Sequence, residues 1–196
     1  MATITSVITA EQALHRLMEG NKKFCTEHYD VHPTVKEIES LVAGQHPYAA
    51  IVACSDSRVP PNEVFDCDLG EIFVVRTAGN VVGDFELGSV EYSVEHLGTP
   101  LVMVLAHRNC GAVAGAYEWT GGEGALASIM NEVLPSVERA RRKASAKEEI
   151  ISLSELYNLE NSVARLKASP LLSAMPEGSV VGAVYDISTG KVEVVC

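Results

Sequence analysis

The sequence has few basic residues for its size and little that could bind a polyanion. Its 15 Lys and Arg residues stand against 26 Asp and Glu residues, which gives a formal net charge of -11 at pH 7. Nucleic acids and anionic membrane surfaces are bound by clustered Lys and Arg side chains. The one basic cluster, ARRKASAK at 140–147, is flanked by glutamates and is typical of the solvated end of a helix. The composition therefore argues against both kinds of partner.

Two kinds of targeting segment are also missing. No apolar stretch reaches the roughly 20 residues that a membrane-spanning helix needs. The first 20 residues lack the basic region and apolar core of a secretory signal. We therefore expect a cytoplasmic protein, with an organelle as the alternative.

The cysteines show no disulfide framework, because their number is odd and their spacing is irregular. In a reducing compartment such thiols stay free for metal binding or catalysis. The five positions are Cys25, Cys54, Cys67, Cys110 and Cys196.

Three short runs are apolar almost throughout, namely YAAIVAC (48–54), IFVVR (72–76) and PLVMVLA (100–106). They are too short and too uniformly apolar for amphipathic helices, and they fit strands buried on both faces of a parallel sheet. Near the end, SVVGAVYDI and KVEVVC are two further strand-like runs joined by a turn, which predicts an antiparallel hairpin.

Helical spacing of apolar residues separates these runs. It predicts helices over 8–28, 33–44, 85–98, 125–142 and 147–168, the first with a capping box of Thr9 and Gln12. Strands that alternate with helices indicate an α/β fold. We expect one domain over 1–196, with a mainly parallel central sheet flanked by helices and an antiparallel C-terminal edge hairpin.

Metal-type side chains follow two of the predicted strands. Cys54 ends the first run, and His107 with Cys110 follows the third. Ligands of open parallel sheets sit at the carboxyl ends of the strands, so these three converge if the two strands are neighbours. Two thiolates and one imidazole form a catalytic type of zinc set, with a fourth position left for water. A structural zinc site would need a fourth ligand, for which Cys67 is the best candidate.

Asp56 and Arg58 follow Cys54 closely and can form a pair. A guanidinium can hold a carboxylate by two parallel hydrogen bonds, which fixes its direction and keeps it ionised. Beside a metal-bound water, such a carboxylate can only accept a proton in a hydrogen bond. We therefore expect Asp56 and Arg58 to be catalytic.

Four segments resemble the β-class carbonic anhydrase family. They are ACSDSRVPPNEVF (53–65), FVVRTAGNVV (73–82), GSVEYSVEHLGTPLVMVLAHRNCGAV (88–113) and VVGAVYDISTGKVEVV (180–195). The resemblance implies that Cys54, His107 and Cys110 bind one Zn2+ per chain and that Asp56 and Arg58 form the catalytic dyad. It also implies a set of substrate-binding residues, namely Gln45, Phe73, Ala78, Tyr92 and Gly111.

The resemblance further implies the reaction and the assembly. The reaction is the reversible hydration of CO2 to bicarbonate and a proton. In this family the glutamine, phenylalanine and tyrosine come from the neighbouring subunit. An obligate homodimer is therefore implied, with a tetramer or larger assembly as an alternative, and residues 1–45 form an arm that packs on the partner.

Two alternatives stay open at this point. Relatives of the family hydrolyse carbonyl sulfide or carbon disulfide, and the chain has Ala106 where the family usually has a glycine, which could narrow the pocket floor. A non-enzymatic zinc or thiol-redox module would instead close the site with Cys67 or with a Cys54–Cys110 disulfide. The only tryptophan, Trp119, follows the metal residues, so we expect no second, inhibitory bicarbonate site of the Trp-Arg-Tyr type.

Overall fold

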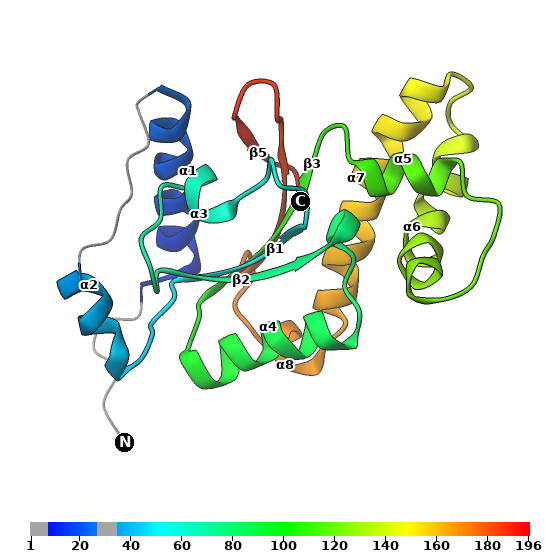
Figure 1. The fold of residues 1–196 in the computed structure, drawn as a ribbon. Coiled ribbons are helices and arrows are strands. Elements are labelled where there is room, and N and C mark those ends of the chain that lie inside the picture. The colour runs from blue at the N-terminus through cyan, green and yellow to red at the C-terminus, as the bar shows by residue number, and fades with distance from the viewer. Residues whose placement is uncertain (1–7, 27–34) are drawn as a thin grey trace.

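A twisted sheet of five strands forms the centre of the computed structural model, which describes residues 8–26 and 35–196 (Figure 1). The strands lie in the order β2-β1-β3-β4-β5, with β1 to β4 parallel and β5 antiparallel to β4. The predicted fold class, including the C-terminal edge hairpin, is confirmed. The strands are β1 (Ala49–Cys54), β2 (Ile72–Thr77), β3 (Leu101–His107), β4 (Val180–Tyr185) and β5 (Val192–Val194).

The predicted helices are present, with ends that shift by a few residues. The prediction at 33–44 corresponds to α2 and the 3-10 turn η1. Residues 33 and 34 of this prediction, and residues 27 and 28 of the one at 8–28, lie outside the described residues. In the part of the chain that the structure describes, no helix is both long and apolar enough to cross a bilayer. The helices are α1 (Ala10–Thr26), α2 (Val35–Ser40), η1 (Leu41–Ala43), α3 (Pro61–Val64), η2 (Ala78–Asn80), α4 (Asp84–Leu97), α5 (Gly111–Tyr117), α6 (Ala125–Arg141), α7 (Lys147–Lys167) and α8 (Pro170–Ser173).

Helices cover both faces of the sheet, because successive strand residues point to opposite sides. Ile51 and Met103 pack in one apolar cluster with Leu17 of α1. Val52 packs in the other with Leu159 of α7. All five side chains are fully buried, and each contributes about 2 kcal/mol by leaving water. The sheet is thus a rigid frame for the loops at its carboxyl edge.

Helix α1 is tied to its own chain at both ends. At its start, the backbone N–H of Thr9 donates to Gln12 Oε1 at 2.8 Å and that of Gln12 donates to Thr9 Oγ1 at 3.2 Å, as the predicted capping box requires. Near its end, the buried Asn21 side chain joins three backbone groups. Residues 8–26 of the predicted N-terminal arm therefore pack on the sheet of their own chain. Contact of the arm with a partner stays a prediction.

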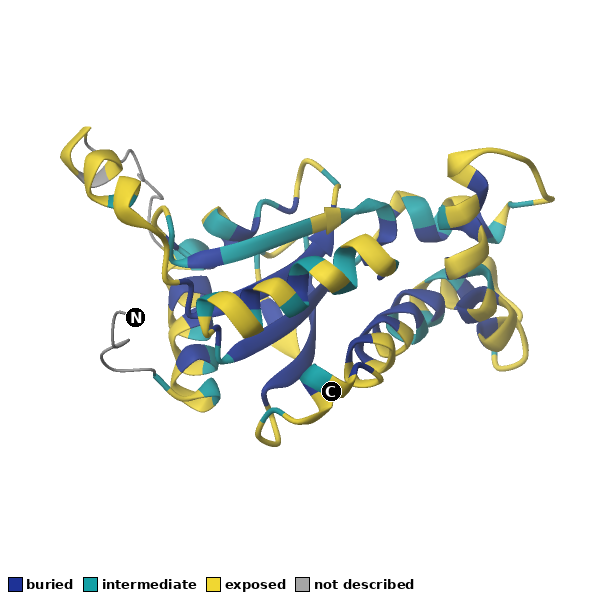
Figure 2. Cartoon of the chain, turned by 90° about the horizontal axis from the view of Figure 1, so that it is seen from below, coloured by how far each residue is buried: buried dark blue, intermediate teal, exposed yellow. Residues whose placement is uncertain are grey.

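The β2 side of the sheet is less covered than the centre. The residues of β2 are mostly half-buried, whereas those of β1 and β3 are all buried. On the neighbouring α4, Phe85 is 89% exposed and Tyr92 is 49% exposed. Figure 2 shows this exposed outer side of α4 in front of the buried strands.

We predict that Asn21→Ala lowers the free energy of unfolding by about 3 kcal/mol, because it leaves three backbone groups without their partner. Asn21 Nδ2 donates to the carbonyls of Val64 and Gly190 at 3.0 and 2.8 Å, and Oδ1 accepts the N–H of Val192 at 2.9 Å. Urea unfolding at fixed protein concentration measures the change. The control is Asn161→Ala, which removes one side-chain hydrogen bond to Ser136. It should lower the free energy of unfolding by less than about 1 kcal/mol. Equal losses in the two variants would contradict the prediction.

Candidate metal centre

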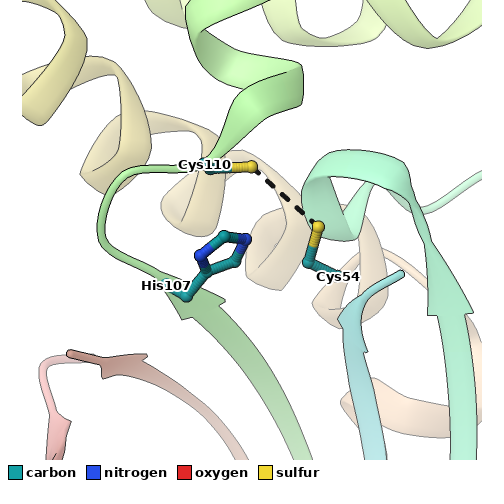
Figure 3. A group of neighbouring side chains, drawn as sticks. All are labelled: Cys54, His107 and Cys110. Carbon is teal, nitrogen blue, oxygen red and sulfur yellow. Dashed lines mark hydrogen bonds between the residues drawn. The ribbon is translucent and has the colours of Figure 1, made fainter. Parts of the chain in front are cut away.

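Three buried side chains meet at the carboxyl edge of the sheet (Figure 3). Cys54 is the last residue of β1 and His107 the last residue of β3, and these two strands are paired neighbours. Cys110 immediately precedes α5. One ligand atom from each residue lies within 4.8 Å of the other two. The predicted convergence of these three residues is therefore present.

Only Arg108 and Asn109 separate His107 from Cys110, and they form a turn. Asn109 has a φ of 56°, a left-handed conformation that asparagine tolerates better than most residues. The turn brings the Cys110 sulfur to 3.9 Å from that of Cys54. Local geometry thus supplies two of the three ligand side chains from one short segment.

The His107 ring is held in the tautomer that a metal ligand needs. Its Nδ1 lies 2.9 Å from the carbonyl oxygen of Arg108, which can only accept, so Nδ1 carries the hydrogen. Nε2 therefore presents a lone pair. This atom is buried and has no hydrogen-bond partner among the described residues. An orphaned buried nitrogen beside two thiols fits a bound cation, and the Nδ1 contact is the usual support of a metal-binding histidine.

The two thiols perturb each other. A hydrogen bond from Cys110 lowers the pKa of the Cys54 thiol, and the Gly79 N–H, 3.3 Å from the Cys54 sulfur, acts in the same direction. The Cys54 sulfur correspondingly raises the pKa of Cys110. Two adjacent thiolates repel each other unless a cation lies between them. The pair is therefore suited to a divalent metal, whose binding releases the remaining proton.

Asp56 and Arg58 form the predicted two-pronged pair. Arg58 Nε donates to Asp56 Oδ1 at 2.9 Å and Nη2 donates to Oδ2 at 2.7 Å. These bonds hold the pKa of Asp56 well below its usual range, with help from the Arg58 backbone N–H. Asp56 Oδ2 lies 4.0 Å from His107 Nε2. An ionised carboxylate therefore stands directly beside the ligand cluster.

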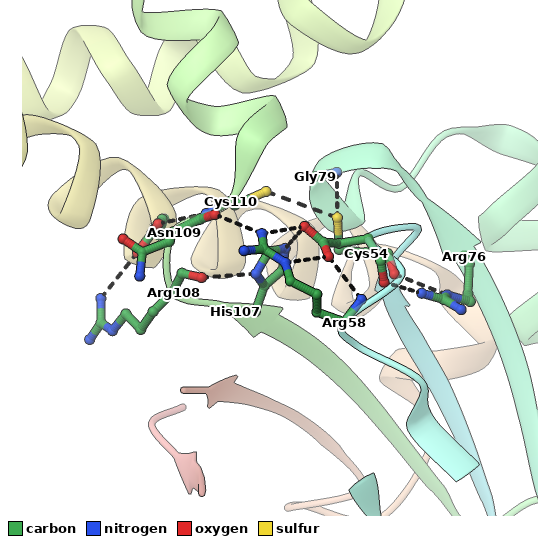
Figure 4. Close-up of polar contacts among 10 residues, drawn as sticks. Cys54, Arg58, Arg76, Gly79, His107, Arg108, Asn109 and Cys110 are labelled. Carbon is green, nitrogen blue, oxygen red and sulfur yellow. Dashed lines mark hydrogen bonds and ion pairs between the residues drawn. The ribbon is translucent and has the colours of Figure 1, made fainter. Parts of the chain in front are cut away.

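Three residues that the sequence reasoning missed hold the loops of the site. Arg76 of β2 donates to the carbonyls of Cys54 and Asp56 at 3.0 and 2.6 Å (Figure 4). Glu155 accepts the backbone N–H of Cys110, and Asn158 donates to the carbonyl of Gly79. A charged residue in the apolar run IFVVR was the only available signal for Arg76. Glu155 and Asn158 had none, because polar residues are common in helices.

The other predicted site residues divide into two groups. Ala78 directly follows Thr77, which pairs with the ligand Cys54. Gly111 directly follows the ligand Cys110. Both residues therefore lie near the ligand cluster. Phe73 and Tyr92 lie together, with ring centroids 6.3 Å apart, but away from it. Phe73 pairs with Ala50, four residues before Cys54, which is about 13 Å along the strand. The exposed Gln45 precedes β1, at the opposite edge of the sheet.

The structure locates two residues, Cys67 and Ala106, on which open alternatives drew. The Cys67 sulfur is 3.0 Å from the Tyr48 hydroxyl and is not part of the ligand cluster, and burial raises its pKa to about 11. A closed site with Cys67 as the fourth ligand is therefore wrong for the described structure.

Ala106 is 2% exposed and belongs to the apolar cluster of Leu159, not to the one that includes Cys54 and Cys110. Its methyl group lies in the core beneath the site.

Known proteins share this arrangement over most of the chain. A family model described as carbonic anhydrase matches residues 49–192, which include all three ligand residues and the Asp56–Arg58 pair. The chain belongs to the carbonic anhydrase family. Carbonic anhydrase 2 of Mycobacterium tuberculosis is 37% identical over 185 residues, covering 89% of this chain and 87% of its own. A carbonic anhydrase of Mycolicibacterium smegmatis is 33% identical, covering 90% and 89%.

Solved structures place this carbonic anhydrase in the β class. A β-carbonic anhydrase from Coccomyxa, in complex with acetazolamide, matches with a TM-score of 0.73 at 27% identity, covering 82% of this chain and 78% of its own. A tetrameric β-carbonic anhydrase of Sordaria macrospora matches with a TM-score of 0.72 at 25% identity, covering 94% and 97%. The predicted family and its α/β fold are confirmed.

We predict that Gly79→Ala destabilises the carbonic anhydrase by about 2 kcal/mol, because it strains a left-handed residue. Gly79 has a φ of +71°, and a Cβ atom there would lie 3.2 Å from the Cβ of Ala112. Chemical unfolding measures the loss. The control is Gly115→Ala in α5, where the new Cβ would make an ordinary 3.7 Å contact with Met130. This control should raise stability by up to about 1 kcal/mol; a Gly79 variant as stable as the control would refute the prediction.

Proposed function

We propose that this chain catalyses the reversible hydration of CO2 to bicarbonate and a proton at one zinc ion held by Cys54, His107 and Cys110. One observation carries the proposal: three buried ligand atoms within 4.8 Å of one another stand beside a carboxylate fixed by an arginine. The relatives named carbonic anhydrases support the same reaction. The donor set also fits zinc, which binds thiolate and imidazole ligands.

Three protein ligands leave one coordination position open, as in catalytic and not structural zinc sites. Zinc in such a site supplies a Lewis acid that makes water nucleophilic near neutral pH. The chain itself supplies the shape of the site. His107 is fixed by the Arg108 carbonyl, and Cys54 is fixed by the Gly79 N–H. Apolar Ala78 and the open space beside Gly111 leave room for a small uncharged molecule.

Asp56 orients the reacting water in this proposal. Because Arg58 keeps it ionised, Asp56 can only accept hydrogen bonds. A water molecule that donates one hydrogen to Asp56 has a lone pair directed elsewhere, toward the substrate carbon. Arg76 donates hydrogen bonds to the backbone carbonyls of both Cys54 and Asp56, which fixes the position of the Asp56 carboxylate relative to the ligand Cys54. The free energy of ordering the water is thus supplied before the reaction begins.

We predict that Asp56→Asn lowers the turnover of CO2 by about 100-fold while the zinc content stays near that of the wild type, because it removes an orienting acceptor and no ligand. Stopped-flow CO2 hydration and metal analysis of the same sample measure both. Asp66→Asn, a left-handed residue paired with Lys23 on the surface, is the matched control. Equal loss of zinc and turnover would mean that Asp56 is structural.

A comparison of substrates tests the alternative function. If the wild-type protein turned over carbonyl sulfide faster than CO2, the enzyme would be reassigned as a carbonyl sulfide hydrolase.

We further propose that the complete site forms between two copies of the chain. In one chain, Gln45 and Phe73 lie far from the ligand cluster along β1 and β2. The Tyr92 ring lies near that of Phe73 on an exposed face of α4, at the less covered edge of the sheet. A two-fold related copy could bring these three residues to the metal site. The tetrameric β-class neighbour supports an oligomer, and we propose a homodimer as its basic unit.

Mixing two inactive variants tests the shared site. We predict that Gln45→Ala and Asp56→Asn chains, unfolded and refolded together, regain activity, because mixed dimers then hold one site with both wild-type residues. Random pairing gives about a quarter of wild-type turnover. Each variant refolded alone is the control. A mixture with only the mean activity of its two parents would show that Gln45 acts within its own chain.

Two further expectations complete the proposal. We propose that residues 1–196 form one domain and that the enzyme is cytoplasmic. The five-stranded sheet, which draws strands from Ala49 to Val194, supports the first. Limited proteolysis and cell fractionation would test them.

A further inference from the structure

We propose that one polar face of helix α7 positions both halves of the metal site. Glu155, Asn158 and Ser162 form this face, which we call the α7 polar stripe. The inference rests on the proposed zinc site and assigns it three positioning residues. None of the three offers an atom to the ligand cluster, so they act only through other residues.

The α7 polar stripe is buried although it is polar. Residues 155, 158 and 162 are three and four positions apart, so they lie on one side of the helix. Their exposures are 4%, 2% and 5%. A buried polar side chain is unfavourable unless it has hydrogen-bond partners. The partners of all three lie in two segments beside the metal ligands, namely the loop from His107 to Cys110 and the turn at 78–80 that contacts Cys54.

Glu155 holds the loop from His107 to Cys110. Its Oε1 accepts the backbone N–H of Cys110 at 3.1 Å, and its Oε2 lies 3.5 Å from Arg108 Nη1. The carbonyl of the same Arg108 accepts the Nδ1 hydrogen of His107. One buried carboxylate is therefore linked to the backbone beside both ligands of this loop.

Asn158 and Ser162 hold the other loop. Asn158 Nδ2 donates to the carbonyl of Gly79 at 2.7 Å, and Ser162 Oγ donates to the carbonyl of Asn80 at 2.9 Å. Gly79 and Asn80 both have positive φ, which glycine adopts freely but which is unfavourable for Asn80, so the turn gains from this support. The turn directs the Gly79 N–H at the Cys54 sulfur, 3.3 Å away. Support of the turn therefore keeps a hydrogen bond on a metal ligand.

The α7 polar stripe could also be needed only for folding. Its removal would then lower the stability of the protein but leave the properties of a bound metal unchanged. Two readouts separate these roles: the affinity for zinc, measured by competition with a chromogenic chelator, and the sulfur-to-metal charge-transfer absorption of the cobalt-substituted protein. The absorption reports how the two thiolates are held around the ion.

The chain offers a matched pair of serines for this test. Ser162 and Ser154 are both buried in α7, and each donates to a backbone carbonyl. The acceptor of Ser162 is the carbonyl of Asn80, in the turn that contacts Cys54, whereas that of Ser154 is the carbonyl of Ile150 within the helix itself. We expect Ser162→Ala to weaken zinc binding by roughly threefold, the loss of about one hydrogen bond. Ser154→Ala should leave zinc affinity and the cobalt spectrum unchanged.

Stronger substitutions extend the test. We expect Glu155→Ala and Asn158→Leu to weaken zinc binding by roughly 10-fold or more and to shift the cobalt charge-transfer band, as for other groups that orient metal ligands. Glu155→Gln should restore most of the affinity, because its amide oxygen can still accept the Cys110 N–H. If the stronger variants fail to fold, the two serine variants decide alone.

The outcomes separate this inference from the proposed function. Wild-type protein that binds no zinc would overturn the proposed function and this inference with it. Zinc-binding wild type with a Ser162 variant indistinguishable from the Ser154 control would overturn the inference alone. Weaker zinc binding and an altered cobalt spectrum in the stripe variants, with the Ser154 control unchanged, would confirm it.

Discussion

Parallel pairing of β1 with β3 is the constraint on which the site depends. The register pairs Ala53 with Leu105, so both strands end at the same edge and bring Cys54 and His107 together. Because side chains alternate along a strand, a slip of one residue would turn a whole set of apolar side chains away from the core. Ile51, Val52 and Met103 are fully buried and fix this register. The hydrophobic core therefore also sets the geometry of the metal ligands.

Arginines balance the negative groups at the carboxyl edge of this acidic protein. Arg58 pairs with Asp56, Arg76 binds the carbonyls of the same loop, and Arg108 lies beside the buried Glu155. Bidentate and charge-assisted hydrogen bonds are stronger and better directed than neutral ones. The arginines therefore fix the direction of the carboxylates and leave the cluster of Cys54, His107 and Cys110 to a cation.

Two sides of the sheet carry different kinds of side chain: the carboxyl ends of the strands on one hand, and the lateral edge at β2 on the other. The carboxyl edge of β1 and β3 holds the ligands and the carboxylate, whereas the β2 edge and α4 present the apolar Phe73, Phe85 and Tyr92. A reaction of a small uncharged molecule needs both a polar centre and an apolar wall. Within one chain these parts are separated by about the length of a strand, and the shared site proposed above would bring them together.

The sequence by itself determined five residues of the candidate site. Cys54, Asp56 and Arg58 follow one apolar run and His107 and Cys110 follow another, and apolar runs of strand length mark where a parallel sheet ends. Only the tertiary structure decided the supports, namely Arg76, Glu155 and Asn158, and the location of Cys67 outside the cluster. Asn158 contacts Gly79 across 79 positions of the chain. Such contacts depend on how helices pack on the sheet, and a polar residue in a helix carries no periodic signal that reveals its partner.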